Sequence, residues 1–193
     1  MGGNAEQVLQ MPAIKSSIPD AIYIAPQGLT DSSGSTGWPN TNGEDIAFTK
    51  AMVADVQAKF CVDNTRIFST GFSYGGIMSD NIACQMPDVF RAVAPIAGML
   101  FSGTSSCKKL PIAEIFTHGS ADTVNDISGN VAVRDYLLGT NHCGTTAKAI
   151  DPSPCVAYDG CDAGKPVVWC EHTGGHMIPS FAASAISAFF KQF

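Results

Sequence analysis

The chain has 193 residues, of which 45% are hydrophobic and 15% are charged. This composition is typical of a globular protein with a sizeable core, and it excludes a disordered chain. The length suits a single domain, which we expect to cover residues 1–193. The net charge of −6, without any Lys/Arg run, argues against nucleic acid or a membrane surface as partner. No apolar run approaches the roughly 20 residues of a membrane helix.

In chain order, short apolar runs alternate with helix-like stretches. Strands are expected at 21–26, 66–70, 92–97, 112–117 and 166–169, and helices at 44–60, 75–85, 124–138 and 180–190. A loop rich in Gly, Ser, Thr and Asn is expected at 28–43. The alternation predicts an α/β fold with a mostly parallel, buried sheet, whose active site would lie at the carboxyl ends of the strands.

One such strand end carries a recognisable motif. The run Gly71-Phe72-Ser73-Tyr74-Gly75 matches G-x-S-x-G, with an expected strand before it and an expected helix after it. This setting predicts a nucleophile elbow, in which crowding leaves room only for glycine at both flanking positions. Ser73 would project into the cleft, and the backbone N–H of Tyr74 would point at the oxyanion. The alternative is a Gly-rich turn in which the serine merely caps a helix.

A serine nucleophile needs a base, and the base needs an orienting acid. In α/β-hydrolases these follow in the order Ser, Asp, His. Asp122 comes just after the expected strand 112–117, and His176 lies in a loop just before the last helix. We therefore expect Ser73, Asp122 and His176 to form a catalytic triad that cleaves an ester through an acyl-enzyme.

Other residues could take the roles of acid and base. Asp126 is a rival acid that lies further into the following helix, and His172 is a rival base. His118 ends a strand, where a structural histidine is the usual finding, and His142 lies in a loop that carries a cysteine. Neither H-E-x-x-H nor C-x-x-C spacing occurs, so we expect no metal site among these histidines.

The seven cysteines indicate an oxidising compartment and therefore secretion. No basic segment followed by an apolar one is visible in Met1–Lys15, so no signal peptide is evident. Cys155 and Cys170 flank a candidate hairpin and could pair across it. The alternative to disulfides is a set of buried free thiols.

Several segments together resemble the fungal-type feruloyl esterases of carbohydrate esterase family one, close to polyhydroxybutyrate depolymerase-like and acetyl xylan esterases. The resemblance runs from about Ile22 to Phe193. The matching segments are 25–28, 37–38, 42–45, 70–76, 90–94, 158–161, 166–169 and 174–176.

The resemblance implies a secreted α/β-hydrolase that needs no cofactor and releases ferulate from plant cell-wall arabinoxylan. Its triad maps onto Ser73, Asp122 and His176. It also implies a Cys143–Cys161 pair, because family members carry cysteines at those two positions, and it leaves Cys61, Cys84 and Cys107 over. Trp38 and Phe72 would be aromatic neighbours of a phenolic ring, although Trp38 could be a packed anchor and Phe72 could be buried behind the elbow.

The sequence departs from the family pattern at its start. Family members begin with about three strands before the equivalent of Ile22, and a His-x-x-Gly-Gly loop supplies a second oxyanion N–H. Met1-Gly2-Gly3-Asn4 looks like the tail of that loop. The expectation is therefore a chain truncated at its N-terminus, from an incomplete gene model or an alternative start, whose strands 21–26 and 66–70 lack the strand between them. One absent upstream cysteine would make the cysteine number even.

Three functions are thus in competition. The expected one is feruloyl ester hydrolysis, with acetyl xylan esterase or polyhydroxyalkanoate depolymerase as close variants. An inactive, truncated esterase-like protein is the second, because the loss of one oxyanion donor costs about 10²–10³ in turnover. A peptidase on the same fold is the last, and no sequence feature favours it.

Overall fold

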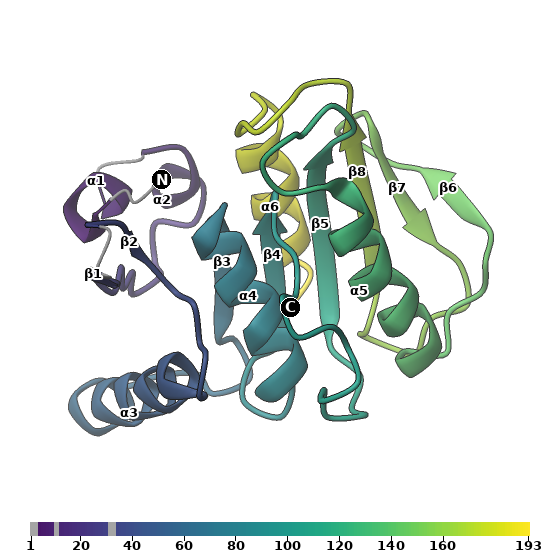
Figure 1. The fold of residues 1–193 in the computed structure, drawn as a ribbon. Helices are drawn as coiled ribbons and strands as arrows, with labels where there is room; N and C mark the ends of the chain where they lie inside the picture. Colours follow the sequence, from purple (N-terminus) through teal and green to yellow (C-terminus); the bar gives the residue numbers. More distant parts are fainter. Residues whose placement is uncertain (1–3, 10–11, 31–33) are drawn as a thin grey trace.

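The computed structural model describes residues 4–9, 12–30 and 34–193. Helices and strands alternate along most of this length, as expected of an α/β protein (Figure 1). The helices are α1 (Ala5–Leu9), α2 (Pro12–Ser17), α3 (Glu44–Lys59), α4 (Tyr74–Gln85), α5 (Ile127–Thr140) and α6 (Ala182–Phe190). The strands are β1 (Leu29–Thr30), β2 (Thr36–Gly37), β3 (Phe68–Phe72), β4 (Ala92–Ile96), β5 (Ala113–Gly119), β6 (Ala147–Ala149), β7 (Cys155–Tyr158) and β8 (Val167–His172). Over the described ranges, no helix has the length and apolarity needed to cross a bilayer.

Six of the strands form one sheet in the order β3-β4-β5-β8-β7-β6. The first four strands of this order run parallel to one another, and β7 and β6 are added antiparallel at the far edge. Strand β5 lies in the interior of the sheet, and all seven of its residues are buried. The carboxyl ends of β3, β4, β5 and β8 therefore meet at one edge, where an active site is expected.

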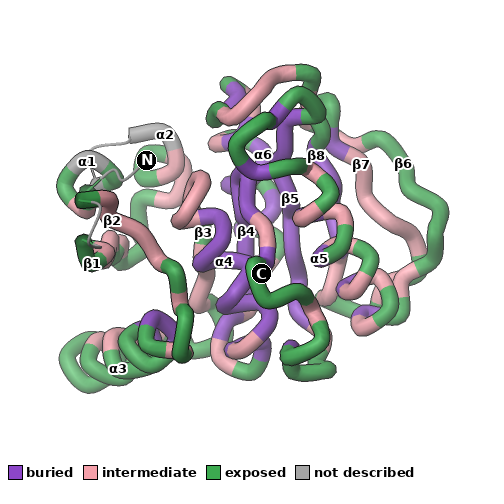
Figure 2. The backbone as a smooth tube through the Cα atoms, viewed as in Figure 1, coloured by how far each residue is buried: buried purple, intermediate pink, exposed green. Residues whose placement is uncertain are grey.

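The sheet lies between two helical layers, and each face has its own apolar cluster (Figure 2). Phe116 of β5 belongs to the cluster beneath α4 and α5, together with Met78 and Leu137. Ile115, one residue earlier, belongs to the opposite cluster, beneath α6. This alternation follows from the two-residue period of a strand. The mostly parallel sheet with helices on both faces confirms the predicted fold class.

Most expected elements occur within a few residues of their predicted bounds. The strand expected at 21–26 is wrong: residues 22–28 form no strand, and Ile22 and Ile24 are 52% and 47% exposed. An apolar run becomes a strand only where a second strand pairs with it, and this one has no such neighbour in the described structure. The sequence analysis also missed β6 and listed no strand at β7, where it expected only a hairpin flanked by Cys155 and Cys170, and it treated 28–43 as loop although β1 and β2 form a small antiparallel sheet there. Residues 31–33 of that loop lie outside the described residues.

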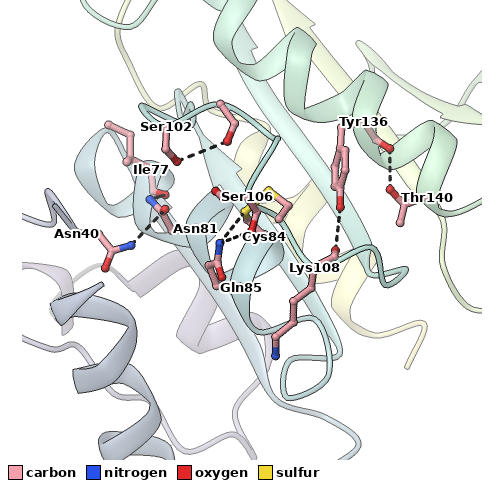
Figure 3. Close-up of a disulfide and its surroundings, with 12 residues drawn as sticks. Asn40, Ile77, Asn81, Cys84, Gln85, Ser102, Ser106, Lys108, Tyr136 and Thr140 are labelled. Carbon is pink, nitrogen blue, oxygen red and sulfur yellow. Dashed lines mark hydrogen bonds between the residues drawn. A yellow bond between two sulfur atoms is a disulfide. The ribbon is translucent and has the colours of Figure 1, made fainter. Parts of the chain in front are cut away.

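Three disulfides fasten the loops to this framework. Cys155–Cys170 joins β7 to β8 at directly opposed positions, and Cys143–Cys161 links the loops on either side of β6 and β7; both expected pairs are found. A third bond, Cys84–Cys107, ties the end of α4 to the loop before β5 (Figure 3). Cys61 is exposed and free. The alternative of buried free thiols is therefore wrong for these six cysteines.

Candidate active site

Ser73 lies between β3 and α4 with φ 56° and ψ −117°, in the left-handed region that non-glycine residues rarely adopt. A Cβ at position 71 would lie 2.5 Å from the backbone of Gly75, so the turn requires glycine there. The expectation that position 75 is equally crowded is wrong, because a Cβ there would meet nothing within 4 Å. The second crowded position is Gly76, where a Cβ would lie 2.5 Å from the Ile96 carbonyl oxygen. Close packing of α4 on β4 therefore explains that glycine.

The structure brings together three side chains that lie far apart in the sequence. His176 Nε2 lies 2.9 Å from Ser73 Oγ, and His176 Nδ1 lies 2.7 Å from Asp122 Oδ2. Asp122 follows β5, while His176 lies between β8 and α6. All three residues therefore meet at the carboxyl edge of the sheet. This is the contact order of nucleophile, base and orienting acid.

Asp122 is held from its other side by the backbone. Its Oδ1 accepts hydrogen bonds from the N–H groups of Val124 (2.8 Å) and Asn125 (3.0 Å). Burial raises the pKa of Asp122, but the hydrogen bonds from His176 and from these two amides outweigh it, so that the pKa of this carboxyl lies below its usual value. A lowered pKa favours the ionised carboxylate, which is the form that an orienting acid requires.

The rival residues have other contacts. Asp126 caps α5 by accepting a hydrogen bond from the Ser128 N–H at 2.9 Å. His172 Nδ1 accepts from the Gly174 N–H, and the exposed His142 pairs with Asp162. Asp126, His172 and His142 therefore make hydrogen bonds that do not involve Ser73.

The backbone N–H of Tyr74 starts α4, where the first amides of a helix have no partner within the helix. The Ser73 N–H donates to the Ile96 carbonyl, and the Ser73 carbonyl accepts from Ile77, which fixes the peptide between Ser73 and Tyr74. The partial positive charge of a helix N-terminus favours an anion at this place. The segment 1–4 was likened to the tail of the second oxyanion loop, and its residues 1–3 lie outside the described residues.

Aromatic rings surround the elbow. The Phe72 ring packs against the His176 ring at a centroid distance of 4.7 Å. The Tyr74 ring lies against Gly37 and meets Phe101 edge-on at 6.4 Å. Trp38 stacks on Phe48 of α3 at 6.2 Å, which is the contact of a packed anchor. Phe101 was missed by the sequence analysis; it is 58% exposed, although it directly follows the apolar Met99 and Leu100 in the loop after β4.

A cavity of about 620 Å³ extends from Phe101 along α4. Its lining combines apolar residues such as Ile46 with amide and hydroxyl side chains, among them Asn40, Asn81, Gln85 and Ser106. Asn40 Nδ2 donates to Asn81 Oδ1 at 3.5 Å, and Gln85 Nε2 donates to the Ser106 carbonyl at 3.0 Å beside the Cys84–Cys107 bond (Figure 3). The described part of the chain contains no cluster of three or more His, Cys, Asp or Glu side chains suited to a metal ion.

Known proteins resemble this chain in sequence, and others resemble it in fold. Feruloyl esterase D of Neurospora crassa is 38% identical over 161 residues, which cover 81% of this chain and 53% of that protein. Probable feruloyl esterase C of Aspergillus niger is 38% identical over 159 residues, covering 81% of this chain and 57% of that protein. The resemblance to the fungal feruloyl esterases is confirmed. This chain spans about half the length of the feruloyl esterases that it matches.

A family model and two solved structures also match this chain and agree with an α/β-hydrolase fold. A model of the prolyl oligopeptidase family matches residues 34–127, which include Ser73 and Asp122. The solved structure of esterase PE8 superposes with a TM-score of 0.73 at 16% identity, covering 99% of this chain and 87% of that one. For the acetyl xylan esterase from Aspergillus awamori, the TM-score is 0.59 at 15% identity, with 75% and 66% covered. At such identities the likeness to solved structures shows the fold alone.

Proposed function

We propose that this chain is a serine esterase, in which Ser73 is the nucleophile, His176 the general base and Asp122 the orienting acid. The observation that carries the proposal is the chain of two short hydrogen bonds, Ser73 to His176 to Asp122, at a strained elbow. A hydroxyl is a weak nucleophile unless an adjacent base removes its proton, and this contact supplies that base.

In the acylation step Ser73 Oγ attacks the ester carbonyl carbon, and its proton passes to His176 Nε2. The tetrahedral oxyanion accepts a hydrogen bond from the Tyr74 N–H at the start of α4. Asp122 accepts from His176 Nδ1 and stabilises the imidazolium. His176 then gives the proton to the leaving alcohol. In deacylation, water takes the place of that alcohol and Ser73 is released with the acid product.

We propose feruloyl esters of plant cell-wall arabinoxylan as the substrate. This rests on the names of the relatives at 38% identity and on the rings of Phe72, Tyr74 and Phe101 about the elbow. An aromatic acyl group gains from edge and face contacts with such rings. The amide- and hydroxyl-lined cavity beyond Phe101 offers hydrogen-bond partners for a saccharide. Trp38 would support this region indirectly, by stacking on Phe48 of α3.

The three disulfides support an extracellular location, since such bonds persist in oxidising compartments. Acetyl xylan esterase and polyhydroxyalkanoate depolymerase activities use the same triad chemistry and remain alternatives for the substrate. Peptidase activity is the second candidate function, favoured by the match to the prolyl oligopeptidase family.

The test is hydrolysis of methyl ferulate, p-nitrophenyl acetate and a proline-containing peptide p-nitroanilide by the purified chain and its Ser73→Ala variant. The proposal expects release of ferulate that depends on Ser73. Release from the peptide alone would replace the proposal with a peptidase, and release from the acetate alone would replace the feruloyl substrate. A folded chain without any activity would contradict the esterase proposal for this chain.

A further inference from the structure

The loop that follows β5 contains a buried asparagine, Asn125, which the mechanism above does not use. It lies three residues after Asp122 and just before α5, and only 7% of its surface is exposed. Burying polar groups is costly unless they find hydrogen-bond partners. The contacts of Asn125 therefore indicate what this residue does in the fold.

The backbone of Asn125 supports the catalytic acid. Its N–H donates to Asp122 Oδ1 at 3.0 Å, beside the Val124 N–H at 2.8 Å. Its carbonyl oxygen lies 2.9 Å from Nε2 of the buried His118 ring. Both backbone groups of Asn125 are thus engaged, and the place of this residue helps to set the place of the Asp122 carboxylate.

The side chain of Asn125 reaches a different loop. Its Nδ2 donates to the Ala97 carbonyl oxygen at 2.7 Å, across 28 positions of the sequence. A carbonyl oxygen only accepts, so the nitrogen end of the amide has to face Ala97. Because Ala97 directly follows β4, this side chain joins the loop after β5 to the loop after β4.

Ala97 needs such support because its backbone is strained. Its φ is 50°, in the left-handed region where a Cβ is crowded. Its N–H donates to the Thr117 carbonyl of β5 at 2.9 Å, and its own carbonyl accepts from Asn125. A strained backbone persists only where its surroundings hold it in place. The bond from Asn125 is one of the contacts that do so here.

The same turn also supports the nucleophile elbow. The carbonyl of Ile96, the residue before Ala97, accepts from the Ser73 N–H at 3.0 Å. A Cβ at position 76 would lie 2.5 Å from this carbonyl oxygen and 3.1 Å from the backbone of Gly98, so the start of α4 packs directly on the turn. A shift of the turn would therefore move Ser73.

We propose that Asn125 is a positioning residue that fixes the loop of Asp122 to the turn 96–98 beneath Ser73. The proposal rests on the proposed function, since Asp122 and Ser73 are the two ends of the triad. Asn125 connects these ends by a path that does not pass through His176. The separation of acid and nucleophile has to be held, because the His176 ring spans it with two short hydrogen bonds.

The experiment compares Asn125→Ala with a matched control, Asn141→Ala. Alanine at position 125 keeps the backbone N–H that bonds to Asp122 and removes the bond to Ala97. Asn141 is also a buried asparagine, and its side-chain amide bonds to both backbone groups of Ile112, but it lies at the opposite end of α5. Both variants lose buried hydrogen bonds, and only the first loses the link between the two loops.

Steady-state kinetics on methyl ferulate separate positioning from general stability. In Asn125→Ala, kcat is expected to fall about 10- to 100-fold with KM within about twofold of the wild type, because the triad geometry is lost while the substrate contacts remain. Asn141→Ala should unfold at a lower temperature and keep the wild-type kcat. An unchanged kcat in Asn125→Ala, or an equal loss in both variants, overturns the proposal.

A second substitution tests whether Asn125 acts by holding the strained turn. Glycine adopts a φ of 50° without steric cost, so the turn depends less on Asn125 when residue 97 is glycine. Adding Ala97→Gly to Asn125→Ala is expected to raise kcat about fivefold or more. A double variant no faster than Asn125→Ala overturns the proposal.

Hydrogen exchange in the resting protein tests the link without any substrate. The amides of Ser73 and Val124 lie on its two sides, and each has an intrinsic exchange rate that residue 125 does not affect. Both should exchange about tenfold faster in Asn125→Ala than in the wild type, and neither should change in Asn141→Ala. Unchanged exchange at Ser73 overturns the proposal, because the two loops would then move independently.

A measurement on the wild type needs no variant to fold. The side-chain amide protons of Asn125 should exchange about 100-fold more slowly than those of the exposed Asn42, and equal rates overturn the proposal. Absence of ester hydrolysis in the wild type counts against the proposed function alone, because the exchange measurements still test the position of Asn125.

Discussion

His176 Nε2 lies 2.9 Å from Ser73 Oγ although 103 positions separate the two residues along the chain. The contact exists because β3 and β8 end at the same edge of the parallel part of the sheet, with two strands between them, and each is followed by a turn. A hydrogen bond of this length allows direct proton transfer from the hydroxyl to the ring. The predictions below test this arrangement and the fold that holds it.

Asp122→Asn should lower kcat by about 10⁴, because an amide in this position no longer fixes the tautomer of His176 or stabilises its charge. The matched control is Asp126→Asn, four residues on, which keeps the cap of α5 and should leave the activity unchanged. Both variants would be compared in initial-rate assays on methyl ferulate. Equal losses in the two variants, or a loss in Asp126→Asn alone, would contradict the assignment of the acid.

Gly71→Ala and Gly75→Ala test the shape of the elbow. The alanine Cβ at position 71 would lie 2.5 Å from backbone atoms that cannot move away without opening the turn, so we expect loss of activity and a stability loss of about 1–3 kcal/mol. At position 75 nothing lies within 4 Å of the new Cβ, and the variant should fold and react like the wild type. Thermal unfolding and ester hydrolysis measure both effects. A tolerant position 71 would show that the elbow has another shape.

The buried Asp80 predicts how stability depends on pH. Burial raises the pKa of Asp80 to about 7, although hydrogen bonds from Glu114 and Asn130 oppose this. Between its unfolded pKa of about 3.9 and this value, the folded chain binds a proton that the unfolded chain has lost. The free energy of unfolding should therefore fall as the pH rises from about 4 to about 7, by up to roughly 4 kcal/mol.

In Asp80→Asn the part of this dependence that Asp80 contributes should disappear, because an amide does not titrate and can still accept from Asn130, while the buried Glu114, whose pKa also lies above its usual value, keeps its own part. Urea unfolding of both proteins at several pH values between 4 and 8 provides the comparison. Parallel curves for the two proteins would show that Asp80 does not titrate in this range.

The Cys84–Cys107 bond should stabilise the chain through its 23-residue separation. Replacing both cysteines by serine is expected to cost about 2–4 kcal/mol of unfolding free energy, because the unfolded chain gains conformations. The cavity beside the bond would loosen with it, since Lys108 N–H and Gln85 Nε2 bond to this corner. Cys61→Ser is the control and should have no effect, because Cys61 is exposed and unpaired. A control that destabilises as much as the double variant would mean that the disulfide adds nothing.

The elbow at Ser73 was predictable from the sequence, because G-x-S-x-G between a strand and a helix is a local pattern. Asp122 and His176 could be placed because each follows a recognisable strand. The meeting of the buried residues Asp80, Glu114 and Asn130 could not be predicted, because they come from three elements whose packing no local pattern encodes. The only indication in the sequence was that Asp80 and Glu114 each lie within an apolar run. The wrong prediction of a strand at 21–26 has the same cause. An apolar run indicates residues that could be buried, but strand formation also depends on a pairing partner elsewhere in the chain.

The most direct test of the central claim is the release of ferulic acid from methyl ferulate by the purified chain and by Ser73→Ala, with Ser184→Ala, an exposed serine of α6, as control. Removal of a triad serine typically costs about 10⁶ in kcat. The account predicts steady release by the wild type and by Ser184→Ala, and none above background by Ser73→Ala. Equal release by the wild type and Ser73→Ala would contradict it.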